Sequence, residues 1–141
     1  MIATTTLTAV PTVRRPPAAK TLWGTGAAAG VVAAAATVGV AAVARAIDVP
    51  LAVGAKAIPL LGFAQLTLVG SIVGTVLAAA MSRRAGRPRH TFVTTTIVLT
   101  LMSIVPDVLA DARTATRVVL ALTHAVAAAI VVPGLASCLT D

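Results

Sequence analysis

The chain has 141 residues, of which 58% are hydrophobic and 11% are charged, and its formal net charge is +7. Soluble domains average roughly 45–50% apolar residues and bury only about 60–70% of their unfolded surface at this size, so an ordinary water-soluble domain is excluded. Nucleic-acid binding is not indicated either, because Trp23, Phe63 and Phe92 are the only aromatic residues available to stack on bases. A lipid bilayer is the expected solvent and partner.

The first 20 residues are predicted to form a disordered, basic tail. They include Pro16 and Pro17, which lack the backbone donors that a helix needs, and they end at Lys20. A basic residue close to anionic headgroups contributes about 1 kcal/mol of binding energy. We therefore expect the tail, residues 1–20, to lie at the cytoplasmic surface of the membrane.

Four long apolar runs follow and predict a transmembrane domain over residues 21–141. Each run approaches or exceeds the roughly 20 residues that cross a hydrocarbon core of about 30 Å. Transmembrane strands are excluded because they alternate apolar and polar residues over about 10 positions. The predicted fold class is therefore all-α, a polytopic membrane protein with a bundle of four transmembrane helices. The predicted spans are Leu22 to Ala44, Ile58 to Met81, Phe92 to Ala110 and Val118 to Leu139.

The basic residues predict the orientation of these spans, because flanking Lys and Arg are retained on the cytoplasmic side. Of the 11 basic residues, seven lie before the first span or between the second and third. The other four lie in the remaining two loops and are accompanied by Asp48, Asp107 and Asp111. Both termini are therefore expected in the cytoplasm of a multi-pass cell-membrane protein. The seven topology-setting residues are Arg14, Arg15, Lys20, Arg83, Arg84, Arg87 and Arg89.

The second half of the chain carries a distinctive pattern. It reads SIVP at residues 103–106, VVLALTH at 118–124 and VVPGL at 131–135, and an Arg/Pro-rich loop precedes it. This pattern resembles a group of small four-helix membrane proteins of GC-rich actinobacteria that is classed as a family of unknown function. Thr123 departs from that group, which often has Met before the histidine. The resemblance covers nearly the whole chain after the tail, and it implies the fold and the membrane location but no catalytic residue.

Two pairs of glycines four residues apart are candidates for helix packing. Gly26 and Gly30 lie in the first span, and Gly70 and Gly74 lie in the second. Such spacing removes side chains from one stripe of a helix, so that a second helix can approach closely. We expect at least one pair to mark a helix contact, either within the bundle or with another membrane protein.

Asp107 is an acidic residue near the end of the third span. A carboxylate inside hydrocarbon costs about 2.5–3.5 kcal/mol on insertion scales. Because Asp107 follows Pro106 near the outer end of its span, we expect it at the membrane interface. There it would cap a short break in the helix or pair with Arg113 or Arg117.

His124 is the one titratable side chain well inside a span, and such residues are candidates for function. Counting about seven residues, or roughly 10 Å, inward from the outer end of each span places Thr37, Gln65, Ser103 and His124 at one depth. We therefore predict a buried polar layer with one residue from each helix. The layer would either join the helices by hydrogen bonds or bind a small polar ligand or proton.

No phosphate-binding loop, HExxH, GxSxG or metal-spaced residue set is present in the sequence. No metal or cofactor is expected, and we predict a non-enzymatic structural or accessory membrane subunit. The sequence leaves two alternatives open, a small transporter or proton-coupled carrier subunit using Gln65 and His124, and an accessory protein of a membrane oxidoreductase. A carrier requires a cavity reaching His124 from one face of the membrane. An oxidoreductase accessory requires a groove beside His124 that lipid can enter.

Overall fold

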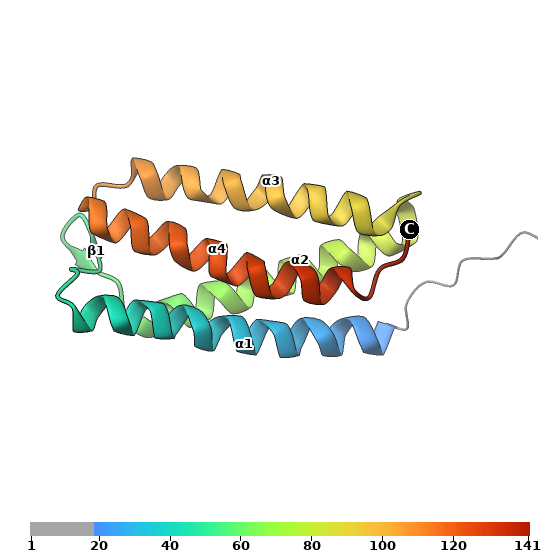
Figure 1. Cartoon of the computed structure of the whole chain (residues 1–141), viewed down its shortest axis with the longest axis horizontal. Coiled ribbons are helices and arrows are strands. Elements are labelled where there is room, and N and C mark those ends of the chain that lie inside the picture. The colour runs from blue at the N-terminus through green and yellow to red at the C-terminus, as the bar shows by residue number, and fades with distance from the viewer. Residues whose placement is uncertain (1–18) are drawn as a thin grey trace, which may run out of the picture.

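The computed structural model describes residues 19–141, which form four antiparallel helices and one short hairpin (Figure 1). All four helices are long and apolar enough to cross a membrane, and their lengths are about 33–42 Å at 1.5 Å per residue. The prediction of an all-helical chain with four such helices is confirmed. The helices are α1 (Ala19–Ala46), α2 (Leu60–Arg84), α3 (Pro88–Leu109) and α4 (Thr114–Ala136).

Prolines account for part of the difference between predicted and observed helix ends. α3 begins at Pro88 rather than Phe92, because proline at the first turn of a helix lacks only an N–H that would have no partner there. Pro106 does not break α3, which continues to Leu109. Lys20, the last residue of the predicted tail, lies in the first turn of α1.

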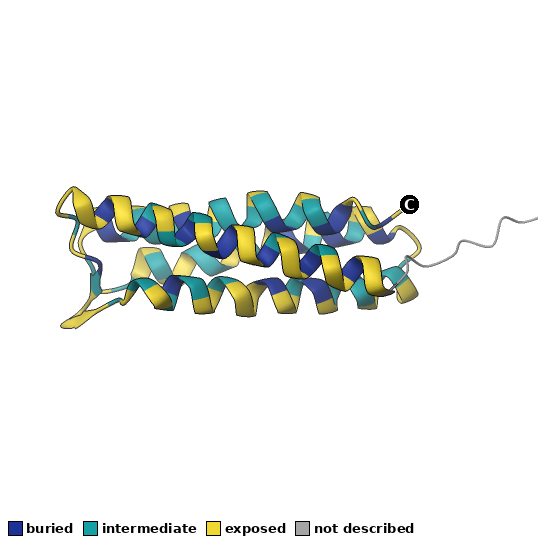
Figure 2. Ribbon diagram, turned by 90° about the horizontal axis from the view of Figure 1, so that it is seen from below, coloured by how far each residue is buried: buried dark blue, intermediate teal, exposed yellow. Residues whose placement is uncertain are grey.

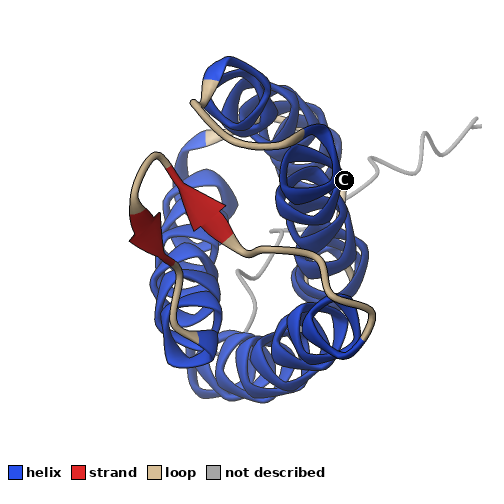
Figure 3. Ribbon diagram, turned by 90° about the vertical axis from the view of Figure 1, so that its left-hand side faces the viewer, coloured by secondary structure: helices blue, strands red, loops and turns tan. Residues whose placement is uncertain are grey.

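The four helices form a ring in the order α1, α2, α3, α4, as the end view shows (Figure 3). α1 packs extensively against both α2 and α4, whereas α2 and α3 pack against each other less than either packs against its other neighbour. The start of α1, the α2–α3 loop and the C-terminus lie together at one end, which we name the terminal end (Figure 1). The opposite end, with the short hairpin and the α3–α4 loop, is named the hairpin end.

Small and hydroxyl-bearing residues bring α1 and α2 together. A Cβ atom at Gly30 would lie 2.9 Å from the Cβ of Ser71, and one at Gly26 would overlap Thr75. The residue that α1 meets on α2 moves backward from Thr75 to Ser71 as α1 advances from Gly26 to Gly30. The two helices are therefore antiparallel. The predicted close approach at the first glycine pair is therefore present, and the contact lies inside the bundle.

Buried apolar side chains form two clusters, and many apolar side chains on the outside of the helices are exposed. Buried and exposed positions alternate along each helix (Figure 2). Phe92 and Leu135 are fully buried in the larger cluster. Ala41 and Phe63 belong to a smaller cluster at the hairpin end. Exposed Val and Leu side chains on helices of this length are what a lipid solvent accommodates and water does not.

A hairpin that the sequence did not reveal closes the α1–α2 connection. Its strands are β1 (Ala52–Val53) and β2 (Lys56–Ala57), paired antiparallel. Gly54 opens the two-residue turn with φ +59°, the conformation that glycine supplies at the first central position of a type II′ turn. Its N–H donates to the carbonyl of Asp111 at 2.6 Å. The hairpin is thereby joined to the α3–α4 loop.

Candidate functional site

A cavity of about 520 Å³ lies between α2, α3 and α4. Ligand pockets commonly enclose about 300–1,000 Å³, so the cavity is large enough for a small molecule. Apolar side chains form most of its wall, and six hydroxyl-bearing residues and one imidazole interrupt them. The hydroxyl-bearing residues are Thr67, Ser71, Thr96, Thr100, Ser103 and Thr123, and the imidazole belongs to His124.

The cavity opens sideways between α2 and α3. Leu66 and Val73 of α2 and Leu99 of α3 line it, yet these side chains are 74%, 57% and 50% exposed. Residues that both line the cavity and remain exposed form its mouth. The mouth lies along α2 and α3, which pack against each other less than any other pair of neighbours in the ring, and in a membrane it would face the lipid chains.

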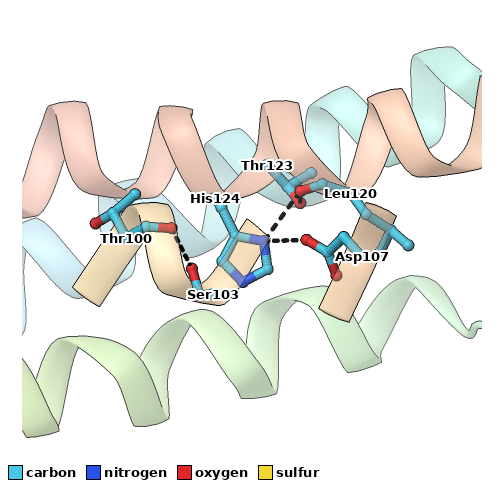
Figure 4. Close-up of polar contacts among 6 residues, drawn as sticks. All are labelled: Thr100, Ser103, Asp107, Leu120, Thr123 and His124. Atoms are coloured by element: carbon cyan, nitrogen blue, oxygen red, sulfur yellow. Dashed lines mark hydrogen bonds and ion pairs between the residues drawn. The ribbon is translucent and has the colours of Figure 1, made fainter. Parts of the chain in front are cut away.

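His124 reaches from α4 into this space and pairs with Asp107 of α3 (Figure 4). Its Nδ1 lies 2.9 Å from Oδ2 of Asp107 and 3.1 Å from the carbonyl oxygen of Leu120. The Nδ1–H bond points at the carbonyl oxygen of Leu120, so Oδ2 of Asp107 has no well-aligned hydrogen bond. The distance between Nδ1 and Oδ2 is nevertheless short enough for an ion pair when the imidazole is charged. Within residues 20–141, no other nitrogen of a basic side chain lies this close to a carboxylate oxygen.

The surroundings of Nδ1 determine which ring nitrogen carries the hydrogen. Both atoms near Nδ1 are oxygen acceptors, and a bare nitrogen lone pair would repel both of them. We therefore assign the hydrogen to Nδ1, which leaves Nε2 of the neutral ring as a hydrogen-bond acceptor. No atom of the described residues is hydrogen-bonded to Nε2. The side chain of His124 is 40% exposed and that of Asp107 only 14%, so the histidine is the member of the pair that a ligand can reach.

Comparison with known proteins identifies the family of the chain. Residues 17–141 match the family of unknown function DUF6069. The chain belongs to this family. No curated protein and no solved structure matches the chain. The prediction of a family of unknown function is thus confirmed, and the match covers the whole described bundle of this DUF6069 member.

The structure brings together only part of the predicted polar layer. Ser103 and His124 both line the cavity, close to each other (Figure 4). Thr37 is buried in a different place, on the α1–α2 contact, where its Oγ1 lies 3.0 Å from that of Thr67. Gln65 is exposed and does not line the cavity, so a buried layer that includes Gln65 is not formed. Thr67, two positions further along α2, occupies the inward position instead.

Asp107 differs from its predicted role. It is paired with His124 rather than with Arg113 or Arg117, and it lies within α3 rather than at a break. The contact could not be predicted from helical periodicity, because Asp107 and His124 are 17 residues apart and lie on different helices joined by a loop. A polar residue near the end of one span and a histidine inside the next were the only hints in the sequence.

The other predicted residues are distributed as follows. Gly74 lies within van der Waals reach of Leu135 and Val131, whereas Gly70 has open space around it and lines the cavity. The second glycine pair therefore does not act as one packing stripe. Among the topology-setting residues, Arg14 and Arg15 lie outside the described residues. The five described ones gather at the terminal end, namely Lys20, Arg83, Arg84, Arg87 and Arg89.

Proposed function

We propose that this chain is a non-enzymatic accessory protein of the cell membrane that binds a membrane-dissolved apolar molecule in the cavity between α2, α3 and α4. The observation that supports this role is the lateral mouth of the cavity beside His124. A mouth between lipid-facing helix surfaces admits a molecule that is already dissolved in the bilayer. The mostly apolar wall offers such a molecule the contacts that a polar solute could not use.

The proposal places both termini in the cytoplasm and the hairpin end outside. Seven of the 11 basic residues belong to segments at or before the terminal end, and a bias of this kind retains the flanking loops on the cytoplasmic side. The five of these residues that the structure describes, in the first turn of α1, the end of α2 and the α2–α3 connection with the start of α3, lie at the terminal end (Figure 1). The orientation therefore follows from the charge distribution together with the four-helix connectivity.

The hydrogen-bond pattern in the cavity supports a binding role rather than catalysis. A serine nucleophile would donate its hydrogen to a histidine base, but Ser103 donates to the carbonyl of Thr100 at 2.7 Å. His124 in turn directs Nδ1 at Leu120 and Asp107. Two acceptors thus orient the His124 ring. The neighbouring hydroxyl of Ser103 donates its hydrogen within α3.

A cavity-filling substitution tests the proposal. Gly70 lines the cavity and has no atom within 4 Å of the position of an added Cβ. Helical side chains lean toward the preceding turn, which here holds the cavity-lining residues Leu66 and Thr67. The side chain of Gly70→Phe should therefore start in open space and extend into the mouth. The measurement is labelling of the protein in lipid nanodiscs by a diazirine-bearing hexadecane, with unlabelled hexadecane as competitor.

The wild-type protein should show a saturable component of labelling, mapped to α2, α3 and α4, which excess hexadecane removes. Gly70→Phe should abolish that component. Gly39→Phe is the matched control, because Gly39 of α1 also has open space and does not line the cavity. Labelling that never saturates, or that is the same in both variants, would show that the cavity does not bind.

The lateral mouth beside His124 also favours a second candidate, an accessory protein of a membrane oxidoreductase that holds a lipid-soluble carrier. Isolation of the protein from native membranes together with a redox subunit, lost in Gly70→Phe but not in Gly39→Phe, would favour this candidate. Association through a small-residue face of the bundle stays a prediction.

A further inference from the structure

Almost all of the hydroxyl hydrogens in the cavity are already donated to carbonyl groups of the protein. We propose that the cavity binds a single-chain amphiphile whose head is an uncharged hydroxyl group, donated to Nε2 of His124, with its tail directed toward the terminal end. This inference rests on the proposed function and specifies the chemical class of the ligand.

The cavity hydroxyls act as donors to their own helices. Thr96 donates to Phe92 at 2.8 Å, Thr100 to Thr96 at 2.8 Å, and Ser103 to Thr100 at 2.7 Å. On the other walls, Thr123 donates to Leu120 and Thr67 to Phe63, both at 2.7 Å. A hydroxyl has one hydrogen and two lone pairs. Each of these side chains therefore presents only lone pairs to a ligand.

Ser71 is the one cavity hydroxyl without a hydrogen-bond partner among the described residues. It lies against Gly30 of α1, at 3.1 Å from the position of an added Cβ there, and so its oxygen faces the α1–α2 contact. The ligand-facing side of the cavity is consequently rich in acceptors and poor in donors. A head group that can only accept, such as a ketone, ester or ether, would leave these acceptors unpaired.

The His124 ring has the same preference. With the hydrogen on Nδ1, the neutral ring offers the lone pair of Nε2, and a charged ring would offer Nε2–H. A hydroxyl can donate to the first and accept from the second. An anionic head would come close to the carboxylate of Asp107, which lies 2.9 Å from the other ring nitrogen. An uncharged hydroxyl is thus the head group that suits both states of the ring.

The length of the cavity indicates where the tail lies. Ser103 and His124 line its wall toward the hairpin end, and Phe92 and Val132 line it toward the terminal end. Ser103 and Phe92 are about 16 Å apart along α3 at 1.5 Å per residue. This distance is about half of a hydrocarbon core of about 30 Å. The apolar part of the cavity can therefore hold one lipid tail of ordinary length.

Three ligands that share a tail but differ in head group distinguish the contribution of the head to binding from that of the tail. Hexadecanol, hexadecyl methyl ether and hexadecane compete with the diazirine-bearing hexadecane for the wild-type protein in nanodiscs. Hexadecanol should compete about tenfold more strongly than the ether, the effect of one buried hydrogen bond. The ether and hexadecane should compete about equally. Gly39→Phe should keep this order.

The imidazole itself provides a direct readout. The chain has two histidines, and His90 is exposed in the first turn of α3, away from the cavity. In protein labelled with ¹⁵N-histidine, hexadecanol should shift the Nε2 resonance of His124, the ether should not, and His90 should serve as an internal control. His124→Leu should make alcohol and ether equal competitors while tail binding persists. The wild-type resonance provides the test even if this variant fails to fold.

The outcomes separate this inference from the proposed function. An alcohol preference with a shift of His124 Nε2 supports the inference. Equal competition by alcohol and ether, or preference for the ether, overturns the hydroxyl assignment but leaves the proposed function standing if Gly70→Phe still blocks labelling. An alcohol preference that persists in a folded His124→Leu protein overturns the role of His124. Absence of saturable labelling overturns the proposed function.

Discussion

At the residue scale, glycine stabilises the bundle at one position of α1 and destabilises the helix at another. Gly30 allows α1 to approach Ser71, and its missing Cβ would lie 2.9 Å from a Cβ atom that is fixed to the backbone of α2. Gly39 faces open space, where glycine only lowers the stability of the helix. Sequence spacing could not distinguish these positions, because every helical glycine looks alike until a neighbouring helix is placed beside it.

Gly30→Ala should lower the free energy of unfolding, and Gly39→Ala should raise it. Alanine is favoured over glycine in a helix by about 1 kcal/mol, but overpacking a tight contact costs about 1–3 kcal/mol. The net effect at Gly30 is a loss of up to about 2 kcal/mol. Unfolding of the purified protein by SDS, followed by circular dichroism, measures both changes. A gain of stability in Gly30→Ala would contradict the close α1–α2 contact.

At the element scale, the connection from α1 to α2 is held in a defined conformation. α1 ends with the N–H of Val49 donating to Ala44 and that of Asp48 donating to Arg45, both at 3.0 Å. These bonds form a Schellman motif, in which the residue after the helix adopts a left-handed conformation. Asp48 has that conformation, with φ +59°, although glycine is the usual residue there.

Two replacements of Asp48 should therefore change the free energy of unfolding in opposite directions. Asp48→Gly should raise the free energy of unfolding by about 1 kcal/mol, because a left-handed residue with a side chain costs roughly 1–2 kcal/mol. Asp48→Val should lower it, since a β-branched side chain tolerates this conformation least. Thermal unfolding of the two variants in one detergent provides the comparison. Equal melting temperatures would mean that the left-handed turn does not form in solution.

At the scale of the whole molecule, the connectivity gathers the five described topology-setting residues at the terminal end and leaves the hairpin at the other end (Figure 1). α3 packs more extensively against α4 than against α2. The lateral mouth of the cavity lies along the less extensive of these two contacts. Orientation in the membrane and access to the cavity are therefore properties of the bundle and not of any single helix.

Cysteine labelling in cells tests the orientation. In a Cys138→Ala background, Ala55→Cys in the hairpin should react with a membrane-impermeant maleimide in intact cells. Gly86→Cys in the α2–α3 loop should react only after permeabilisation. Both positions are exposed, and neither substitution removes a basic residue. Labelling of residue 86 in intact cells would reverse the proposed topology.

The candidate site was only partly predictable from the sequence. His124 was recognisable because a titratable residue inside an apolar run is unusual, and Ser103 was placed near it by counting residues from the span ends. Gln65 was placed by the same count and is exposed. A count gives the depth of a residue but not its direction around the helix, and one helical position turns a side chain by about 100°.

The sequence by itself determined that the chain forms four long apolar helices, because only helices of that length satisfy their own backbone groups in hydrocarbon. Tertiary structure alone decided that Asp107 meets His124, that Gly30 rather than Gly70 lies in a close contact, and that α2 and α3 separate around a cavity. These features depend on the rotation and tilt of each helix. Both are set by the packing of small and large side chains against neighbouring helices.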